Sequence, residues 1–322
     1  MLRGTLKALL LACAVSVLAC PPAISQDWPR RPVKIIVIAS PGGFPDIAAR
    51  TVANQLTGAL GQPVVVENRA GGGGNIATDA VAKAAPDGHT LLLTGNNHAV
   101  NPTLLPNPGF DYEKDLAPIT MVAEANMVLV GSPALQANNI TELIALSKRT
   151  PKAMSIATSA IGTPNHLGAE LLIAMTKIDF VVVPYKGIGP AIPDLVSGQV
   201  QVSIAALTAM LPLIKSGKLK ALAVTRPKRS EFAPEIPTAA ESGLPGFDVN
   251  AWVCIMVTGG TPQPVIQRLN SEIRKIMANP EIKEAFNKQG TEPWTTTPEE
   301  LSSYIKAEAA KWADVLKNAK MR

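Results

Sequence analysis

Cysteine and aromatic residues are scarce in this sequence. Only three of its 322 residues are cysteine, and Phe, Trp and Tyr together make up 4 %. Cys13 and Cys20 lie in an apolar N-terminal segment, so only Cys254 is expected in a mature chain, which excludes an intramolecular disulfide and a cysteine metal cluster. Val, Ile, Leu and Ala must build the core, and Cys254, within the apolar run VCIMV, is expected to be an inert buried thiol.

Motifs of nucleotide-binding proteins and common hydrolases are also missing. The chain contains no G-x-G-x-x-G, G-x-x-x-x-G-K-[ST], G-x-S-x-G or H-E-x-x-H. Of its three histidines only His166 has a carboxylate one helical turn on, Glu170, which is too few ligands for a metal. No nucleophile has an evident base, and His89, at the start of an apolar run, is expected to be structural. The sequence therefore predicts no catalytic residues, no cofactor and no metal.

Clusters of one charge sign are absent. The 30 Lys and Arg residues fall to 28 if Arg3 and Lys7 are removed with a leader, against 25 Asp and Glu, which leaves a net charge of +3. This mild, dispersed charge favours small anions and gives no reason to expect nucleic acid as a partner.

The N-terminus has the pattern of a secretory signal peptide. A basic start, an apolar segment at Ala8–Ala19 and small residues before Gln26 predict a signal peptide over residues 1–25. A lipid anchor at Cys20 ranks second, because Leu18 is a poor residue for a lipoprotein cleavage site.

Short apolar runs alternate with helical patterns along the chain. The predicted strands are Val33–Ala39, Val64–Glu67, Thr90–Thr94, Met154–Thr158, Phe180–Val183, Val202–Ala205 and Leu219–Thr225. The predicted helices are Pro45–Leu60, Asn75–Ala84, Ile140–Arg149, Asn165–Met175, Ala191–Ser197 and Leu207–Ser216, with two more opening at Pro262 and Pro298. This alternation predicts an α/β fold with parallel-rich sheets covered by helices. Glu308 interrupts the apolar stripe of the last helix, so its middle turn is expected to reach solvent.

Two stretches break this rhythm and suggest two domains. Residues 117–131 are long and extended, and residues 225–247 form a Pro-rich, charged loop. We therefore expect an inserted domain at 124–225 and a discontinuous domain made of 26–123 and 226–322. Two such lobes would form a hinged pair with a ligand cleft between the C-terminal ends of their strands.

The loop after the first strand is the leading candidate for ligand binding. It comprises Ser40, Pro41, Gly42, Gly43 and Phe44. Backbone N–H groups and the dipole of the following helix favour an anion here, although the glycines could simply make a tight turn. Phe44 could contact a ligand or pack under the loop, and Asp46 is expected to be a structural cap.

Further loops with hydrogen-bond donors follow other strands. Their candidate residues are Asn75, then Asn96, Asn97 and His98, then Gly162, Thr163, Asn165 and His166, and finally Lys186 and Gly187. The alternatives are a bare turn at Asn75, a loop cap at His98 and a solvated lysine at Lys186. Repeated donor-rich loops without catalytic groups fit a binding protein better than an enzyme.

Taken together these segments resemble the Bug-type periplasmic receptors of tripartite tricarboxylate transporters. The similar segments include WPRRPVKIIV, PGGFPDIAAR, LGQPVVVENRAGGGGNIATDAVAKAAPDGHTLLL, GTPNHLGAEL, VPYKG, GKLKALAVT and KRSEFAPEIPT. They run from about Trp28 to the C-terminus. The resemblance implies a two-domain Venus-flytrap fold that closes on a small carboxylate, a periplasmic location, and loops such as Ser40–Phe44 and Gly162–His166 that hold the ligand.

Three positions depart from the family pattern. Phe44-Pro45 replaces a small residue followed by Thr or Ser, Pro164-Asn165 replaces two hydroxyl residues, and Ala205-Ala206 replaces an Asp-Asn pair. In the family the Asp-Asn pair would contact the far end of the ligand. Ala205, which takes the place of the Asp, is therefore included as a ligand-binding position. The hypothesis is a ligand with a less polar or aromatic far end.

The resemblance implies a receptor that delivers its carboxylate to membrane transporter subunits, and we expect it to be a monomer. Two alternatives remain: a sensing partner of a membrane histidine kinase, and a secreted two-domain α/β enzyme.

Overall fold

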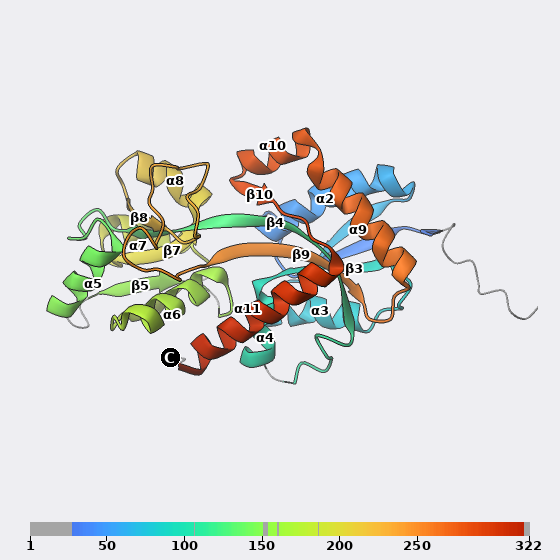
Figure 1. Ribbon diagram of the computed structural model, residues 1–322, viewed down its shortest axis with the longest axis horizontal. Helices are drawn as coiled ribbons and strands as arrows, with labels where there is room; N and C mark the ends of the chain where they lie inside the picture. Colours follow the sequence, from blue (N-terminus) through green and yellow to red (C-terminus); the bar gives the residue numbers. More distant parts are fainter. Residues whose placement is uncertain (1–27, 106, 151–153, 160, 186, 319–322) are drawn as a thin grey trace, which may run out of the picture.

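The computed structural model describes residues 28–105, 107–150, 154–159, 161–185 and 187–318, so the signal peptide expected at 1–25 lies outside the described residues. Strands and helices alternate along the chain (Figure 1). The strands are β1 (Val33–Val37), β2 (Val64–Asn68), β3 (Thr90–Gly95), β4 (Leu116–Gly131), β5 (Ser155–Thr158), β6 (Val181–Pro184), β7 (Val202–Ala206), β8 (Lys220–Val224), β9 (Asn250–Thr258) and β10 (Thr291–Pro293). The helices are α2 (Phe44–Leu60), α3 (Asn75–Ala82), α4 (Asn96–Leu104), α5 (Ile140–Arg149), α6 (Pro164–Thr176), α7 (Ile192–Ser197), α8 (Leu207–Lys215), α9 (Gln263–Ala278), α10 (Pro280–Lys288) and α11 (Pro298–Asn318).

The predicted α/β class is confirmed, and the sheet is mixed. Its main order is β2-β1-β3-β9-β4-β7-β5-β6, with β8 and β10 also paired to β4. Strand β1 is parallel to β2 and β3, and β5 is parallel to β6 and β7, as the alternation predicts. Strands β4 and β9 run antiparallel to their neighbours.

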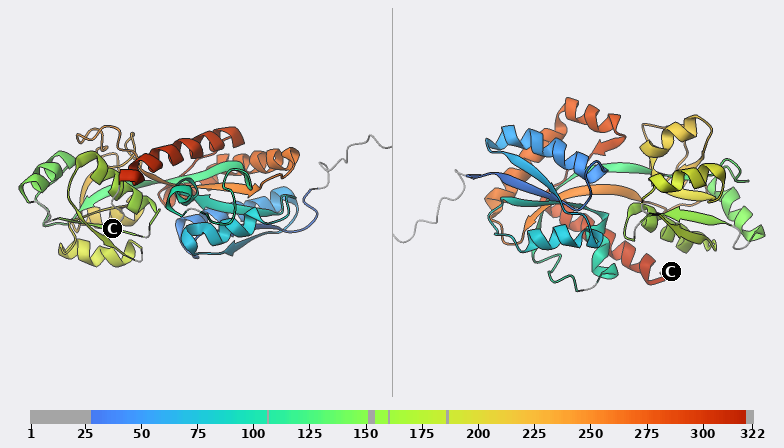
Figure 2. Two further views of the ribbon diagram at one scale, coloured as in Figure 1. Left: turned by 90° about the horizontal axis from the view of Figure 1, so that it is seen from below. Right: turned by 180° about the vertical axis from the view of Figure 1, so that it is seen from behind.

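The long strand β4 joins the two halves of the molecule. Its residues Leu116–Asn126 pair with β9, its residues Met127–Gly131 pair with β7, and Val128–Gly131 also pair with β8 on the other edge. We call β1–β3, β9, β10 and their helices the first half, and β5–β8 with α5–α8 the second half. Figures 1 and 2 show β4 and β9 crossing between these halves.

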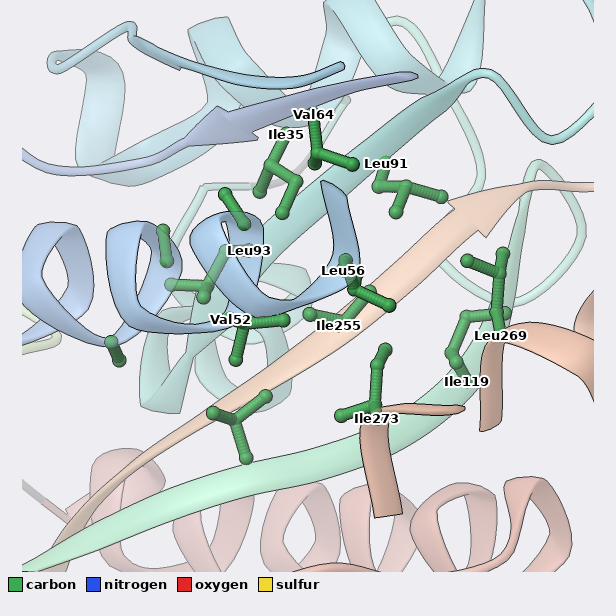
Figure 3. Close-up of a cluster of buried hydrophobic side chains, with 14 of the residues drawn as sticks. Ile35, Val52, Leu56, Val64, Leu91, Leu93, Ile119, Ile255, Leu269 and Ile273 are labelled. Atoms are coloured by element: carbon green, nitrogen blue, oxygen red, sulfur yellow. The ribbon is translucent and has the colours of Figure 1, made fainter. Parts of the chain in front are cut away.

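Aliphatic side chains cover both faces of the first half's sheet. Val33, Ile35 and Val37 of β1 pack into the cluster under α2 and α9, whereas Ile36 points into a second cluster on the opposite face. Figure 3 shows Ile35 and Leu91 in the first of these clusters, beside Leu56 of α2 and Ile255 of β9. Cys254 is fully buried on β9, and burial raises the pKa of its thiol, as expected for an inert cysteine.

Helix α11 packs on both halves. Leu301 lies in the second cluster of the first half, while Trp312 and Leu316 lie in a cluster of the second half. The expectation that the middle of this helix reaches solvent is wrong, because Glu308 is 7 % exposed. Its carboxylate accepts hydrogen bonds from Trp312 Nε1 at 2.8 Å and Lys311 Nζ at 3.1 Å, and these bonds compensate its burial.

Helix α4 is an element that the sequence pattern does not predict. It begins with two polar residues and contains Pro102, so residues 94–102 look like a loop. The helix forms because tertiary contacts favour it: Asn96 donates from Nδ2 to the carbonyl oxygen of Asn250 at 3.0 Å and accepts from the N–H of Trp252 at 3.1 Å.

Candidate functional site

The first candidate loop connects β1 to α2. Ser40, Pro41 and Gly42 are exposed, and Gly42 has φ +83°, a left-handed conformation that glycine adopts without strain. Gly43 caps α2 with no side chain, and its N–H donates to no atom of the described residues. The first turn of a helix leaves N–H groups without intrahelical acceptors, and the helix dipole adds partial positive charge. The loop can therefore hold an anion with backbone donors.

Asp46 fixes the shape of this loop from inside. Its carboxylate accepts from the N–H of Gly42 at 2.9 Å, from Arg50 Nε at 3.0 Å and from Asn68 Nδ2 at 2.9 Å. Asn68 also donates to the carbonyl oxygen of Ala39 at 2.9 Å. Burial alone would raise the pKa of Asp46, but the bonds from Arg50, Gly42 and Asn68 outweigh it and hold the pKa below its usual value. Asp46 is thus a structural residue, as its place in the first helical turn suggests.

Replacing this carboxylate should destabilise the protein in a pH-dependent way. Asp46→Asn should lower the free energy of unfolding at pH 7 by about 1–2 kcal/mol, through the lost charge-assisted bonds. Because its folded pKa is depressed, Asp46 contributes stability above its unfolded pKa of 3.8 and loses it as the pH falls through the lower folded value. Urea unfolding of both proteins should give a difference that shrinks below pH 3.8. An equal difference at pH 7 and pH 3 would contradict this role.

Phe44 is partly buried and packs against the cluster under α2 and α9. Packing under the loop, one of its two expected roles, is therefore what the contacts of this side chain support. Contact with a ligand stays a prediction.

The three candidate residues at the start of α4 point in different directions. Asn96 is buried, and its amide binds the backbone of β9. Asn97 is partly exposed and lies toward the second half, while His98 is buried on another side of the helix, edge-on to Tyr112 at a ring separation of 5.1 Å. Successive residues of a helix are about 100° apart, so a single site cannot collect all three side chains.

In the second half, the loop before α6 is tied together by its own side chains. Asn165 donates from Nδ2 to the carbonyl oxygen of Ile204 at 2.7 Å and accepts from the hydroxyl of Ser159. Thr163 caps α6 by accepting from the N–H of His166 at 3.5 Å. The N–H of Gly162 donates to Nδ1 of His166 at 3.4 Å. Asn165 and His166 thus shape this loop with their side chains.

His166 and Glu170 form a buried contact rather than a metal site. Nε2 of His166 lies 3.8 Å from Oε1 of Glu170. Burial lowers the pKa of His166 and raises the pKa of Glu170, so both shifts favour the uncharged forms. The described residues hold no cluster of three His, Cys, Asp or Glu side chains suited to a metal ion.

The loops of the two halves meet at Gly162. Gly162 has φ +80°, and a Cβ there would lie 3.3 Å from Asn97 Nδ2 and 3.4 Å from the side chains of Val100 and Leu104. Glycine thereby lets the loop after β5 approach the helix that follows β3. The sequence-predicted residues Gly162 and Asn97 therefore lie side by side, where the carboxyl ends of parallel strands from both halves converge.

Three other candidate positions are placed away from that contact or outside the described residues. Asn75 accepts through Oδ1 from Asn101 Nδ2 at 2.8 Å and from the hydroxyl of Tyr112, so its acceptor is used within the first half. Gly187 is partly exposed with φ +107°, and Lys186 lies outside the described residues.

Ala205 is fully buried in the core of the second half. Its contact with a ligand stays a prediction. Ala206 is the partly exposed residue of this pair. Successive side chains of a strand point to opposite faces, and that alternation along β7 could have distinguished the two.

No helix within the described ranges is both long and apolar enough to cross a membrane.

Comparison with known proteins gives consistent similarities. A family model, the tripartite tricarboxylate transporter family receptor (TctC), matches residues 48–321. Protein BugT of Bordetella pertussis is 40 % identical over 298 residues, which cover 92 % of this chain and 91 % of BugT. The structure of R. palustris Rpa4515 with adipate has a TM-score of 0.80 and 32 % identity, covering 90 % of this chain and 98 % of that one. The structure of the periplasmic binding protein BugD has a TM-score of 0.76 and 35 % identity, with the same coverage.

Proposed function

The chain belongs to the tripartite tricarboxylate transporter receptor family, whose members are periplasmic solute-binding receptors and not enzymes, and on this premise we propose that it captures a small organic carboxylate between its two halves and delivers it to a membrane transporter. The observation that carries the proposal is the approach of Gly162 to Asn97, which brings the N-termini of α6 and α4 together. Helices α2 and α6 both begin at the ends of parallel strands, and both have proline in the first turn. Their dipoles and backbone donors suit one carboxylate group.

The chemistry of the candidate loops favours an anion over a neutral ligand. Gly42 and Gly43 carry no side chain, and the loop they form approaches a ligand with backbone groups alone. The adipate in the R. palustris relative is a carboxylate, which makes this ligand class the natural one to test here.

We also propose that the chain divides into the domains 26–123 with 226–322 and 124–225. In support, β4 changes its pairing partner between Asn126 and Met127. On the return crossing, the N–H and the hydroxyl of Thr225 both donate to the carbonyl oxygen of Met127, and the hydroxyl also donates to the carbonyl oxygen of Val249. A rotation at these two crossings would open and close the site, and ligand binding would favour the closed form.

A panel of acids tests this function directly. Calorimetry and thermal unfolding with benzoate, succinate, adipate and citrate should reveal saturable one-to-one binding of at least one acid and a matching rise in Tm. The diamide of adipate, uncharged and of the same length, is the control and should not bind. Binding of the diamide as tightly as of its acid, or of none of the acids, would contradict a carboxylate receptor.

The same panel tests the far end of the ligand. We propose that Phe44 and Ala206, whose side chains carry no polar group, face the far end of the ligand, so acids with an apolar or aromatic far end should bind more tightly than citrate. Stabilisation by citrate-like acids alone would contradict this preference.

A further inference from the structure

A cavity lies on the far side of α4, between that helix, the segment 112–118 and α11. Its volume is about 130 Å³. It is lined by His98, Ala99, Pro102, Tyr112, Glu113, Leu116, Pro118, Met256, Ser302, Ile305, Lys306 and Ala309. Figure 1 shows α11 passing beside α4, with the start of β4 next to it. None of the lining residues belongs to Ser40–Phe44 or to Gly162–His166, so this cavity is separate from the proposed carboxylate site.

Most of the cavity wall is apolar. Leu116, Met256, Ile305 and Ala309 line it, together with two prolines and the ring of Tyr112. The hydroxyl of Tyr112 is already used by Asn75. An apolar cavity of about 150 Å³ accommodates a molecule the size of benzene. The cavity is therefore the right size for one six-membered ring.

His98 is a buried polar residue of this wall. Its side chain is more than nine-tenths buried, and neither ring nitrogen hydrogen-bonds to any described residue. Burial lowers the pKa of His98 to about 4, so the imidazole is neutral at pH 7 and offers one donor and one acceptor. A hydroxyl group in the cavity would give the imidazole a hydrogen-bond partner, which would offset part of the cost of burying it.

The rim of the cavity carries no net charge. Lys306 Nζ lies 3.8 Å from Glu113 Oε2, and both side chains are more than half exposed. An ionised ligand would lose part of its hydration inside the cavity, where the buried His98 is neutral and the charge of Lys306 is offset by that of Glu113.

We propose that this cavity is a second binding site, which takes an uncharged molecule made of one six-membered ring and one hydroxyl group. The ring packs against Leu116, Met256 and Ile305, and the hydroxyl group binds the imidazole of His98. Phenol is the simplest probe of this class.

A pair of variants on α11 tests the site. Ala309 lines the cavity and is partly exposed, whereas Ala310 is exposed and lies outside it. Calorimetry should show one-to-one phenol binding to the native protein and to Ala310→Leu, and at least tenfold weaker binding to Ala309→Leu. Ser302 lies seven residues before Ala309 on the same face of α11. Ser302→Leu should therefore also fill the cavity and weaken phenol binding at least tenfold. Equal phenol binding by Ala309→Leu and Ala310→Leu would overturn the proposal.

A second comparison tests the role of His98. His98→Leu should weaken phenol binding about three- to tenfold, which corresponds to the loss of one hydrogen bond. The same substitution should change benzene binding less than twofold. An equal loss for phenol and benzene would overturn recognition of the hydroxyl group. Benzoate provides the test of ligand charge. If benzoate binds more tightly than phenol, and Ala309→Leu abolishes its binding, the choice of an uncharged ligand is overturned.

Discussion

Gly43→Pro should lower the affinity for the carboxylate identified by the panel by about 10- to 100-fold, because hydrogen bonds to charged groups contribute about 1.5–3 kcal/mol. In the proposed site the N–H of Gly43 donates to the ligand, and proline removes that donor. The backbone at Gly43 has φ −83° and ψ 167°, which proline can adopt. The substitution therefore changes the donor while the chain path stays the same.

Gly43→Ala is the matched control for this experiment. A Cβ at Gly43 would meet only Pro45 Cδ and the carbonyl oxygen of Ser40, both at 3.8 Å, an ordinary contact distance. Alanine keeps the N–H, so its affinity should stay within threefold of the native protein. Calorimetry measures the affinities, and Tm verifies that both variants fold. If the two variants bind equally well, backbone donation from Gly43 is not part of the site.

Arg226→Leu should destabilise the protein by about 2 kcal/mol, because it removes the partner of a carboxylate where the halves join. Arg226 pairs with Glu124 of β4, whose side chain is 15 % exposed, against 29 % for Arg226. Glu124 also accepts from Asn250 Nδ2 of β9 at 2.7 Å. The expected loss is smaller than that for a fully buried pair, since water still reaches the guanidinium group.

Arg229→Leu provides the comparison for this ion pair. Arg229 pairs with Glu241 at 2.9 Å, but these side chains are 45 % and 48 % exposed, so the loss should be below about 1 kcal/mol. Urea unfolding gives both values. In a double variant, Glu124→Gln should recover part of the loss from Arg226→Leu, because the buried charge is then gone. If Arg226→Leu and Arg229→Leu lower the free energy of unfolding equally, the ion pair between Arg226 and Glu124 contributes no more to stability than an exposed pair.

Much of the fold follows from local sequence patterns. The apolar run from Val33 to Val37 faces clusters on both sides, which is why an uninterrupted strand is recognisable there. The helix Ile140–Arg149 has the predicted bounds, because Asn139 caps it by accepting from the N–H of Glu142 at 2.8 Å. Such signals act between residues a few positions apart, so a single sequence is enough to read them.

The candidate site is only partly readable in the same way. Gly42 and Gly162 could be identified from the sequence as candidate ligand-binding residues, since a glycine turn between a strand and a helix predicts backbone donors. Asn96, Asn97 and His98 look equivalent in the sequence, yet one binds β9, one lies by Gly162 and one faces the cavity beside α11.

By itself the sequence determined the family, the alternation of strands and helices, and the loops that open helices after parallel strands. Tertiary structure alone decided which side chains of those loops remain open to a ligand. The partners of α4 come from positions 65 and more than 150 residues away, at Gly162 and Asn250. Glu308 is buried for the same reason, since α11 lies across both halves. Contacts between such distant segments depend on how the halves pack, and no local pattern in the chain encodes them.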